Sequence, residues 1–123
     1  MKRALVIEDQ KPVRESIGEL LRLAGFEARL IGDGQAAFEE LLKVPYDLIT
    51  LDLNMPSLDG VSLIEAVASQ EGPNSKTPVI VVSAYLSSTT EEDLRQFGIK
   101  FFLSKPFEAE DLLIPARRLL GKS

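Results

Sequence analysis

Short apolar runs alternate with amphipathic stretches along the whole chain, and this alternation constrains the fold more than any other feature of the sequence. The apolar runs that we expect to form strands cover residues 4–7, 26–31, 48–51, 79–82 and 101–103. Three of them are continuously apolar, as strands buried on both faces of a sheet are, whereas the run 26–31 is mixed and suits a strand nearer an edge. Strict alternation with short loops predicts a parallel sheet with helices on both faces and right-handed crossovers.

Apolar residues also recur at helical spacing between the strands, which predicts helices over residues 13–24, 37–42, 61–68, 89–97 and 112–120. Gly25 suits the C-terminal end of the first helix. Thr89 and Glu92 have the spacing of a capping box that would open the fourth helix, and Gly98 would end it. Pro115 removes a backbone hydrogen bond inside the fifth helix, so we expect that helix to bend or to restart there.

Composition excludes several kinds of site. The chain has 123 residues, enough for one hydrophobic core, and its net charge of −5 argues against a nucleic-acid surface. No apolar run approaches the length of a membrane span. The sequence has no cysteine and no histidine, which excludes disulfides, thiolate or imidazole metal sites, and Ser-His-Asp triads. Any site must therefore be built from carboxylates, hydroxyls, lysine and main chain.

Four of the expected strands end in residues that can carry chemistry: Glu8-Asp9, Asp52, Ser83 and Lys105-Pro106. In a parallel sheet the carboxyl ends of the strands meet at one edge, so we expect these side chains to share one crevice. Clustered carboxylates repel one another unless a cation joins them, and oxygen-only ligands suit a hard ion such as Mg²⁺. A carboxylate beside Mg²⁺, with a lysine and a hydroxyl nearby, has the parts for phosphoryl transfer, with Asp52 as the nucleophile.

The stretches LVIEDQ, YDLITLDLNMPSLDG, PVIVVSA and FFLSKPF resemble, in order and spacing, the receiver domain of two-component response regulators. The resemblance covers nearly the whole chain and implies a single receiver domain over residues 1–123. It implies a flavodoxin-like, doubly wound α/β fold. In that fold a five-stranded parallel sheet with strand order 2-1-3-4-5 and five helices form three layers.

The resemblance also implies a phosphoacceptor and a metal site. Asp52 would be the phosphoacceptor, and it would bind Mg²⁺ or Mn²⁺ together with Asp9. Glu8 would act on the metal through water, and Asn54 would contribute its backbone carbonyl. The family's usual acidic pair is Asp-Asp, and this chain departs from it at Glu8.

Further roles implied by the resemblance concern the phosphoryl group and the switch. Ser83 and Lys105 would contact the phosphoryl group, and the Lys105-Pro106 peptide bond is expected to be cis. Phe102 stands where the family keeps an aromatic switch side chain. Because phenylalanine has no hydroxyl, its switching would have to be driven by packing alone.

As a function, the resemblance implies a cytoplasmic, phosphorylation-dependent signalling switch in a two-component phosphorelay. A histidine kinase or phosphotransfer protein would donate the phosphoryl group, and the partner-binding face would then change. The domain would catalyse only its own phosphoryl transfer and dephosphorylation. The signal would leave through a downstream protein partner or an output domain in a longer chain, without direct contact to nucleic acid or membrane.

The candidate site residues also have plainer structural interpretations. Asp52 alone could cap the turn that includes Asn54, and Glu8 with Asp9 could cap the following helix. Lys105 could be a solvated surface lysine. The occupied strand ends, taken together, favour the chemical interpretation for the three acids and the lysine.

Three other side chains are more ambiguous. Ser83 could bond only to the main chain, and the two interpretations of this residue stay open. Phe102 fits ordinary core packing somewhat better than a moving switch. Tyr85 overhangs the predicted crevice, where it would either restrict access of phosphodonor and water or be an exposed aromatic without a role.

Two other classes of function stay open at this point. Aspartyl-phosphate phosphatases also place an aspartate after a parallel strand, but they usually carry a second acid two residues later, where this chain has Asn54. An unphosphorylated interaction module could share the fold. The intact set of acids, hydroxyl and lysine argues against that alternative.

Overall fold

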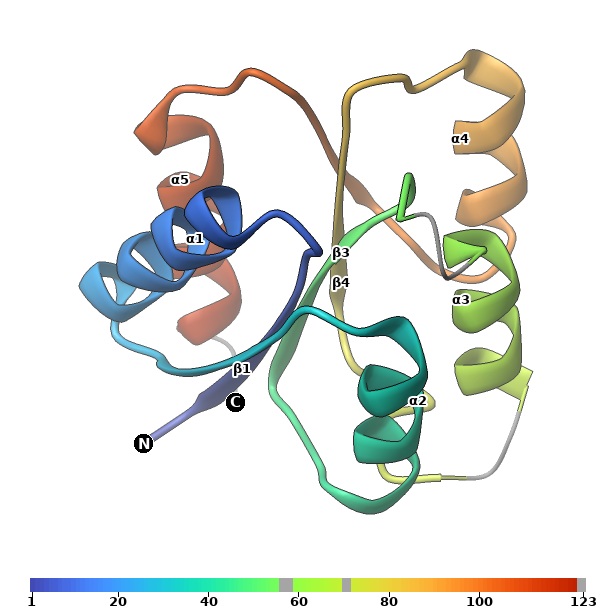
Figure 1. Ribbon diagram of the computed structural model, residues 1–123, viewed down its shortest axis with the longest axis horizontal. Helices are drawn as coiled ribbons and strands as arrows, with labels where there is room; N and C mark the ends of the chain where they lie inside the picture. Colours follow the sequence, from blue (N-terminus) through green and yellow to red (C-terminus); the bar gives the residue numbers. More distant parts are fainter. Residues whose placement is uncertain (56–58, 70–71, 122–123) are drawn as a thin grey trace.

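The computed structural model describes residues 1–55, 59–69 and 72–121, and within them five strands alternate with five helices (Figure 1). The strands are β1 (Arg3–Ile7), β2 (Glu27–Ile31), β3 (Leu48–Asp52), β4 (Val79–Ser83) and β5 (Phe101–Ser104). The helices are α1 (Lys11–Ala24), α2 (Gly34–Lys43), α3 (Gly60–Ser69), α4 (Ser88–Arg95) and α5 (Ala109–Leu120). Residues 56–58, which belong to the sequence motif around Asp52, lie outside the described residues.

All described strands are parallel, and they form one sheet in the order β2-β1-β3-β4-β5. The predicted doubly wound α/β fold and its strand order are therefore confirmed. The mixed run that we placed nearer an edge is β2, which does lie at one edge of the sheet. The order reverses between β1 and β3, and this position puts the ends of these two strands side by side.

Helices cover both faces of the sheet, with α1 and α5 on one side and α2, α3 and α4 on the other (Figure 1). Strand side chains alternate between these faces, because successive residues of a strand point in opposite directions. In β1, for example, Leu5 and Ile7 pack toward α2 and α3, whereas Ala4 and Val6 pack toward α1 and α5. This double burial explains why the central strands are almost uniformly apolar.

The first helix ends as predicted, and the fourth begins elsewhere. Gly25 follows α1 with a φ of 112°, a left-handed conformation that glycine adopts readily. The predicted capping box of Thr89 and Glu92 is wrong, because Ser87 is the N-cap of α4 and its side chain accepts from the backbone N–H of Thr90 at 3.1 Å. The segment 87–90 consists of four hydroxyl residues, each able to cap a helix, so spacing alone does not select one.

Pro115 lies inside α5, which runs without interruption from Ala109 to Leu120. Of the two predicted alternatives, a bend or a restart, the continuous helix excludes the restart. Leu112, Leu113 and Ala116 are buried against the sheet, and the Asp111 carboxylate accepts from the backbone N–H of Glu108 at 2.9 Å at the start of the helix. Tertiary packing on both sides of the proline thus outweighs the single backbone hydrogen bond that it removes.

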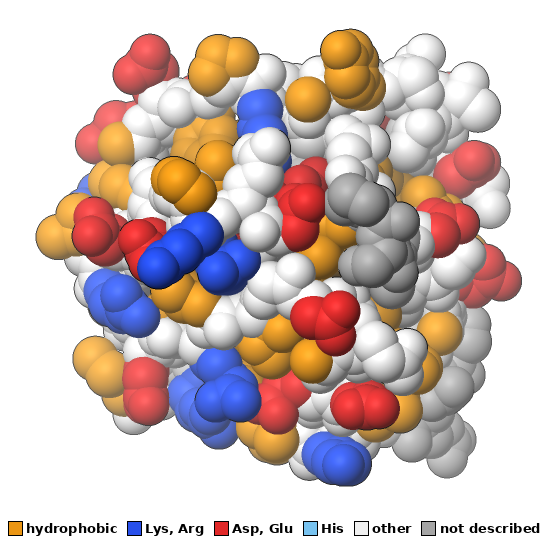
Figure 2. Space-filling view, in the orientation of Figure 1, with side chains coloured by type: hydrophobic (Ala, Val, Ile, Leu, Met, Phe, Trp, Pro, Cys, Tyr) orange, Lys and Arg blue, Asp and Glu red, His pale blue; other side chains and the backbone are white. Residues whose placement is uncertain are grey.

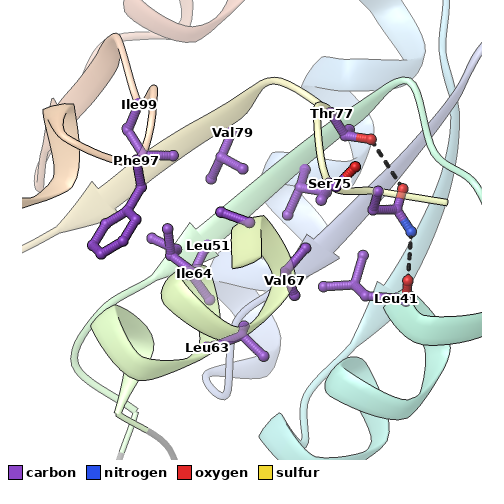
Figure 3. A pocket seen from close by; sticks show the side chains of 13 residues that line it. Leu41, Leu51, Leu63, Ile64, Val67, Ser75, Thr77, Val79, Phe97 and Ile99 are labelled. Carbon is purple, nitrogen blue, oxygen red and sulfur yellow. Dashed lines mark hydrogen bonds between the residues drawn. The ribbon is translucent and has the colours of Figure 1, made fainter. Parts of the chain in front are cut away.

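A small cavity of about 30 Å³, room for about one water molecule, lies between α3 and the sheet (Figure 3). Its polar wall is the buried Asn74, whose side-chain amide donates to the carbonyl of Leu41 at 2.7 Å and accepts from the Thr77 hydroxyl at 3.0 Å. Thr77 precedes β4, so this cavity lies toward the amino ends of the strands. It is therefore separate from the crevice predicted at their carboxyl ends.

Candidate functional site

The predicted acidic crevice forms at the carboxyl ends of β1 and β3. These two strands pair in parallel with Ile7 opposite Leu51, so the residues that follow, Glu8 and Asp52, emerge side by side. Carboxylate oxygens of Glu8, Asp9 and Asp52 all lie within 4.8 Å of one another. Glu8 and Asp52 are buried, and Asp9 is partly exposed. The structure thus brings Asp52 close to the adjacent acids Glu8 and Asp9, which are far from it in sequence.

Lys105 reaches into this cluster from the end of β5. Its Nζ lies 2.6 Å from a Glu8 oxygen and 3.3 Å from an Asp52 oxygen. Its backbone N–H donates to the carbonyl of Ser83 at 2.9 Å, which anchors it beside β4. The Lys105–Pro106 peptide bond is cis. The interpretation of Lys105 as a solvated surface lysine is therefore wrong, and only 19% of its side chain is exposed.

The electrostatics of the cluster favour an added cation. Burial raises the pKa of Glu8 from its ordinary 4.5 to about 7; the hydrogen bonds from Lys105 and Gln10 lower it, and Asp52 raises it. Burial also disfavours the charge on Lys105, but its hydrogen bond to Glu8 and the negative charge of Asp52 outweigh burial and raise the pKa of Lys105. Three carboxylates thus face a single ammonium group, which leaves the cluster with excess negative charge.

Asp52 has two contacts that explain both interpretations of this residue. One of its oxygens accepts from the backbone N–H of Asn54 at 2.9 Å, which is the turn-capping contact. Its other oxygen faces Lys105. Capping therefore does not exclude chemistry, because the turn fixes the orientation of the carboxylate while its second oxygen stays in the crevice.

Ser83 is buried at the end of β4 and is fully hydrogen-bonded. Its Oγ accepts from the side-chain amide of Asn54 at 2.6 Å and from the backbone N–H of Tyr85 at 3.2 Å. Its proton is donated to the carbonyl of Tyr85 at 3.1 Å. Ser83 therefore bonds to more than the main chain, and Asn54 joins the ends of β3 and β4.

The capping interpretation of Asp9 is not supported, because the N-cap of α1 is Gln10 and no side chain caps this helix. Sequence reasoning missed a neighbouring residue, Arg14. Its guanidinium donates to the backbone carbonyls of Glu8 at 2.9 Å and Asp9 at 3.2 Å. The only sequence signal was its position one turn into the helix that follows the acids, and an arginine there is usually solvated.

Phe102 and Tyr85 flank the site in different ways. Phe102 is partly buried on the α4 side of the sheet, and the guanidinium carbon of Arg95 lies 5.3 Å from the centre of its ring. A cation–π contact with Arg95 thus adds to the packing of the Phe102 ring. Tyr85 is 85% exposed, which fits both interpretations of this residue.

Charge does not single out a binding surface on the face shown in Figure 2, where acidic and basic side chains are interspersed. None of the helices within the described residues is both long enough and apolar enough to cross a membrane.

Comparison with known proteins identifies the family. The model of the response regulator receiver domain matches residues 4–117. The sensory transduction protein RegX3 of Mycolicibacterium smegmatis is 32% identical over 122 residues, which are 99% of this chain and 52% of RegX3. The chain thus spans about half the length of that relative.

Solved structures give the same result. The chemotaxis response regulator CheY4 of Vibrio cholerae superposes with a TM-score of 0.85 at 28% identity, covering 97% of this chain and 98% of CheY4. The response regulator TrrA of Thermotoga maritima, solved in complex with Mg²⁺-BeF, gives a TM-score of 0.81 at 27% identity over 97% of this chain and 99% of TrrA. This chain belongs to the receiver domain family of two-component response regulators, which act as phosphorylation-dependent switches.

Proposed function

We propose that Asp52 is the residue that accepts the phosphoryl group in this receiver domain. The observation that carries the proposal is the position of the Asp52 carboxylate. One oxygen is fixed by the backbone N–H of Asn54, and the other lies 3.3 Å from the ammonium of Lys105 inside an acidic cluster. A carboxylate held in this way is oriented and next to a group that can neutralise a phosphoryl oxygen.

The donor set of the crevice fits a hard divalent cation. Three carboxylates with oxygens within 4.8 Å of one another, and only one ammonium among them, suit Mg²⁺ or Mn²⁺ better than a softer metal. The Mg²⁺-BeF complex of TrrA supports this assignment. Asp9, Asp52 and the Asn54 carbonyl would hold the ion directly, and Glu8 through water. Bound there, the ion supplies charge neutralisation for the acids and the phosphoryl oxygens.

The reaction is an in-line transfer from a phosphohistidine. An Asp52 oxygen attacks the phosphorus, the new O–P bond forms, and the N–P bond breaks, so that the imidazole leaves with the electron pair. Lys105 neutralises charge on the transferred group, and the Ser83 hydroxyl donates a hydrogen bond to one of the phosphoryl oxygens. Beyond this transfer and the later hydrolysis of the acyl phosphate, the domain has no enzymatic activity of its own.

Phosphorylation then changes the face formed by α4 and β5. The Ser83 hydroxyl breaks its hydrogen bond to the carbonyl of Tyr85 and bonds the phosphoryl group instead. This movement draws the segment after β4 inward. Phe102 moves into the space left beneath α4, away from Arg95. The affinity for a partner changes only to the extent that the partner binds the phosphorylated and unphosphorylated conformations with different affinity.

The donor is a histidine kinase or a phosphotransfer protein in the cytoplasm. Residues 1–123 act as a single receiver domain, and the signal passes to a protein partner or to an output domain, as in relatives about twice as long. This domain makes no direct contact with nucleic acid or membrane.

Intact-mass spectrometry after incubation with acetyl phosphate tests the proposal. We expect one added phosphoryl group in the wild type with Mg²⁺, none with EDTA and none in Asp52→Asn. The matched control is Asp47→Asn, which changes an exposed aspartate just before the amino end of the same strand and should be labelled like the wild type. Labelling that persists in Asp52→Asn would show that another residue is the acceptor.

A further inference from the structure

Arg14 holds the main chain of both acids that follow β1. Its Nη1 donates to the carbonyl of Glu8 at 2.9 Å and to the carbonyl of Asp9 at 3.2 Å. One nitrogen thus bonds two consecutive carbonyls, which fixes the orientation of two successive peptide planes. The direction of each Cα–Cβ bond follows from its peptide planes, so this contact helps to aim the Glu8 and Asp9 carboxylates.

The guanidinium occupies space that only a glycine leaves free. A Cβ built on Gly32, in the loop after β2, would lie 2.3 Å from Arg14 Nη1. Gly32 is not among the glycines with positive φ, so its backbone conformation suits other residues as well. A glycine at position 32 is therefore required for the Arg14 guanidinium to occupy its observed position, because a Cβ there would displace it.

The Arg14 guanidinium contacts main-chain carbonyls and pairs with no carboxylate among the described residues. Among the described residues, its guanidinium donates hydrogen bonds to carbonyl oxygens, and no ion pair within 4.0 Å involves it. Arg14 therefore holds the main chain of the acids without pairing with their carboxylates, which leaves their negative charge available for a cation.

We propose that Arg14 is a positioning residue of the metal site, and that Gly32 provides the space that this role requires. The inference rests on the proposed Mg²⁺ site. Residues that orient metal ligands typically account for about 10–100-fold in metal affinity. Because Arg14 acts through the main chain, we expect the lower end of that range.

Mg²⁺ binding by isothermal titration calorimetry tests the inference on the metal-free protein. We expect Arg14→Met to weaken Mg²⁺ binding about tenfold. Gly32→Ala should weaken it similarly, because the new methyl group displaces the guanidinium. Combining the two substitutions should add nothing further, since both remove the same contact. Arg22→Met is the matched control: this exposed arginine of α1 donates to the Ala28 carbonyl at 3.3 Å, and the variant protein should bind Mg²⁺ like the wild type.

A conservative variant separates positioning from charge. Arg14→Lys keeps the positive charge but replaces the planar guanidinium, so positioning predicts weakened Mg²⁺ binding. The phosphorylation assay gives an independent readout. With acetyl phosphate, the Mg²⁺ concentration for half-maximal rate should rise in Arg14→Met, whereas the rate at saturating Mg²⁺ should stay near the wild-type value. A merely structural role would lower the saturated rate or the amount of folded protein, and would leave Mg²⁺ affinity of the folded fraction unchanged.

Several outcomes would overturn the inference. Unchanged or tighter Mg²⁺ binding by Arg14→Met, with the wild type binding Mg²⁺ normally, contradicts a positioning role. Full affinity in Arg14→Lys assigns the effect to charge, and additive losses in the double variant separate Gly32 from Arg14. Absence of Mg²⁺ binding by the wild type would instead overturn the proposed metal site, and the inference with it.

Discussion

The side-chain amide of Asn54 donates a hydrogen bond of 2.6 Å to the hydroxyl of Ser83, and this contact joins the turn after β3 to the end of β4. On the proposed mechanism, this hydrogen bond helps to hold Ser83 away from the phosphoryl position before phosphorylation. On the proposed mechanism, the hydroxyl that moves on activation is thus restrained by a residue two positions from Asp52, the proposed phosphoacceptor.

Replacing Asn54 with alanine should favour the activated arrangement, because a resting-state hydrogen bond worth about 0.5–1.5 kcal/mol is removed. We expect beryllium fluoride, a phosphoryl mimic, to bind about 2–10-fold more tightly in the presence of Mg²⁺. Calorimetry measures this affinity. In the Ser83→Ala background the same substitution should have no such effect, and equal effects in both backgrounds would show that the Asn54–Ser83 bond is not the restraint.

Lys105→Met should destabilise the metal-free protein, because Glu8 and Asp52 lose the ammonium that lies between them. Removing one partner of a buried ion pair costs about 3–5 kcal/mol. The partial exposure of Lys105 reduces our expectation to about 1–3 kcal/mol. Urea unfolding in EDTA measures the loss, and saturating Mg²⁺ should restore part of it.

The matched control for this substitution is Lys11→Met, which breaks the exposed pair with Glu15 at 4.0 Å. Its effect should stay below about 0.5 kcal/mol. A loss in Lys105→Met no larger than in the control would mean that the central ammonium does not stabilise the acids.

The stability of the metal-free protein should depend on pH through Glu8. Its pKa is about 7 in the folded state and ordinarily 4.5, so the folded state binds the proton more tightly than the unfolded state. The contribution of this group is fully present below about pH 4.5 and is lost as the pH rises through about 7. Glu8→Gln should flatten this part of the curve of unfolding free energy against pH. An unchanged curve would exclude Glu8 as the titrating group.

Thr50→Val should stabilise the protein. Among the buried side-chain polar atoms of the described residues, the Thr50 hydroxyl is the one without a hydrogen-bond partner, and valine has nearly the same shape. We expect a gain of about 1 kcal/mol in urea unfolding. Thr77→Val is the matched control and should destabilise by a similar amount, because its hydroxyl contacts the Tyr46 carbonyl and Asn74. Destabilisation by both substitutions would indicate that Thr50 is satisfied in solution.

Much of the fold and of the acidic cluster could be predicted from the sequence, because both depend on local periodicity. Alternating strand and helix patterns define the parallel sheet, and a parallel sheet brings its strand ends to one edge. Glu8, Asp52 and Lys105 occupy such ends, so their approach follows from topology without any knowledge of side-chain packing.

What could not be predicted depends on contacts between distant segments. Arg14 approaches Gly32 only after α1 has packed against β2, and Arg95 approaches Phe102 only after α4 has packed beside β5. The start of α4 was missed for a different reason, since several neighbouring hydroxyls compete for one cap. The uninterrupted course of α5 through Pro115 likewise reflects burial of its flanking residues.

The alternation of strand side chains gives the domain two hydrophobic clusters that share no residue. The sheet therefore separates two hydrophobic clusters, one packed against α1 and α5 and the other against α2, α3 and α4. The rearrangement that we propose beneath α4 would leave the packing of α1 and α5 unchanged, and α1 carries Arg14, which bonds the main chain of Glu8 and Asp9. On the proposed mechanism, the α1 and α5 side would thus keep the metal ligands in place while the α4 side moves and is recognised by a partner.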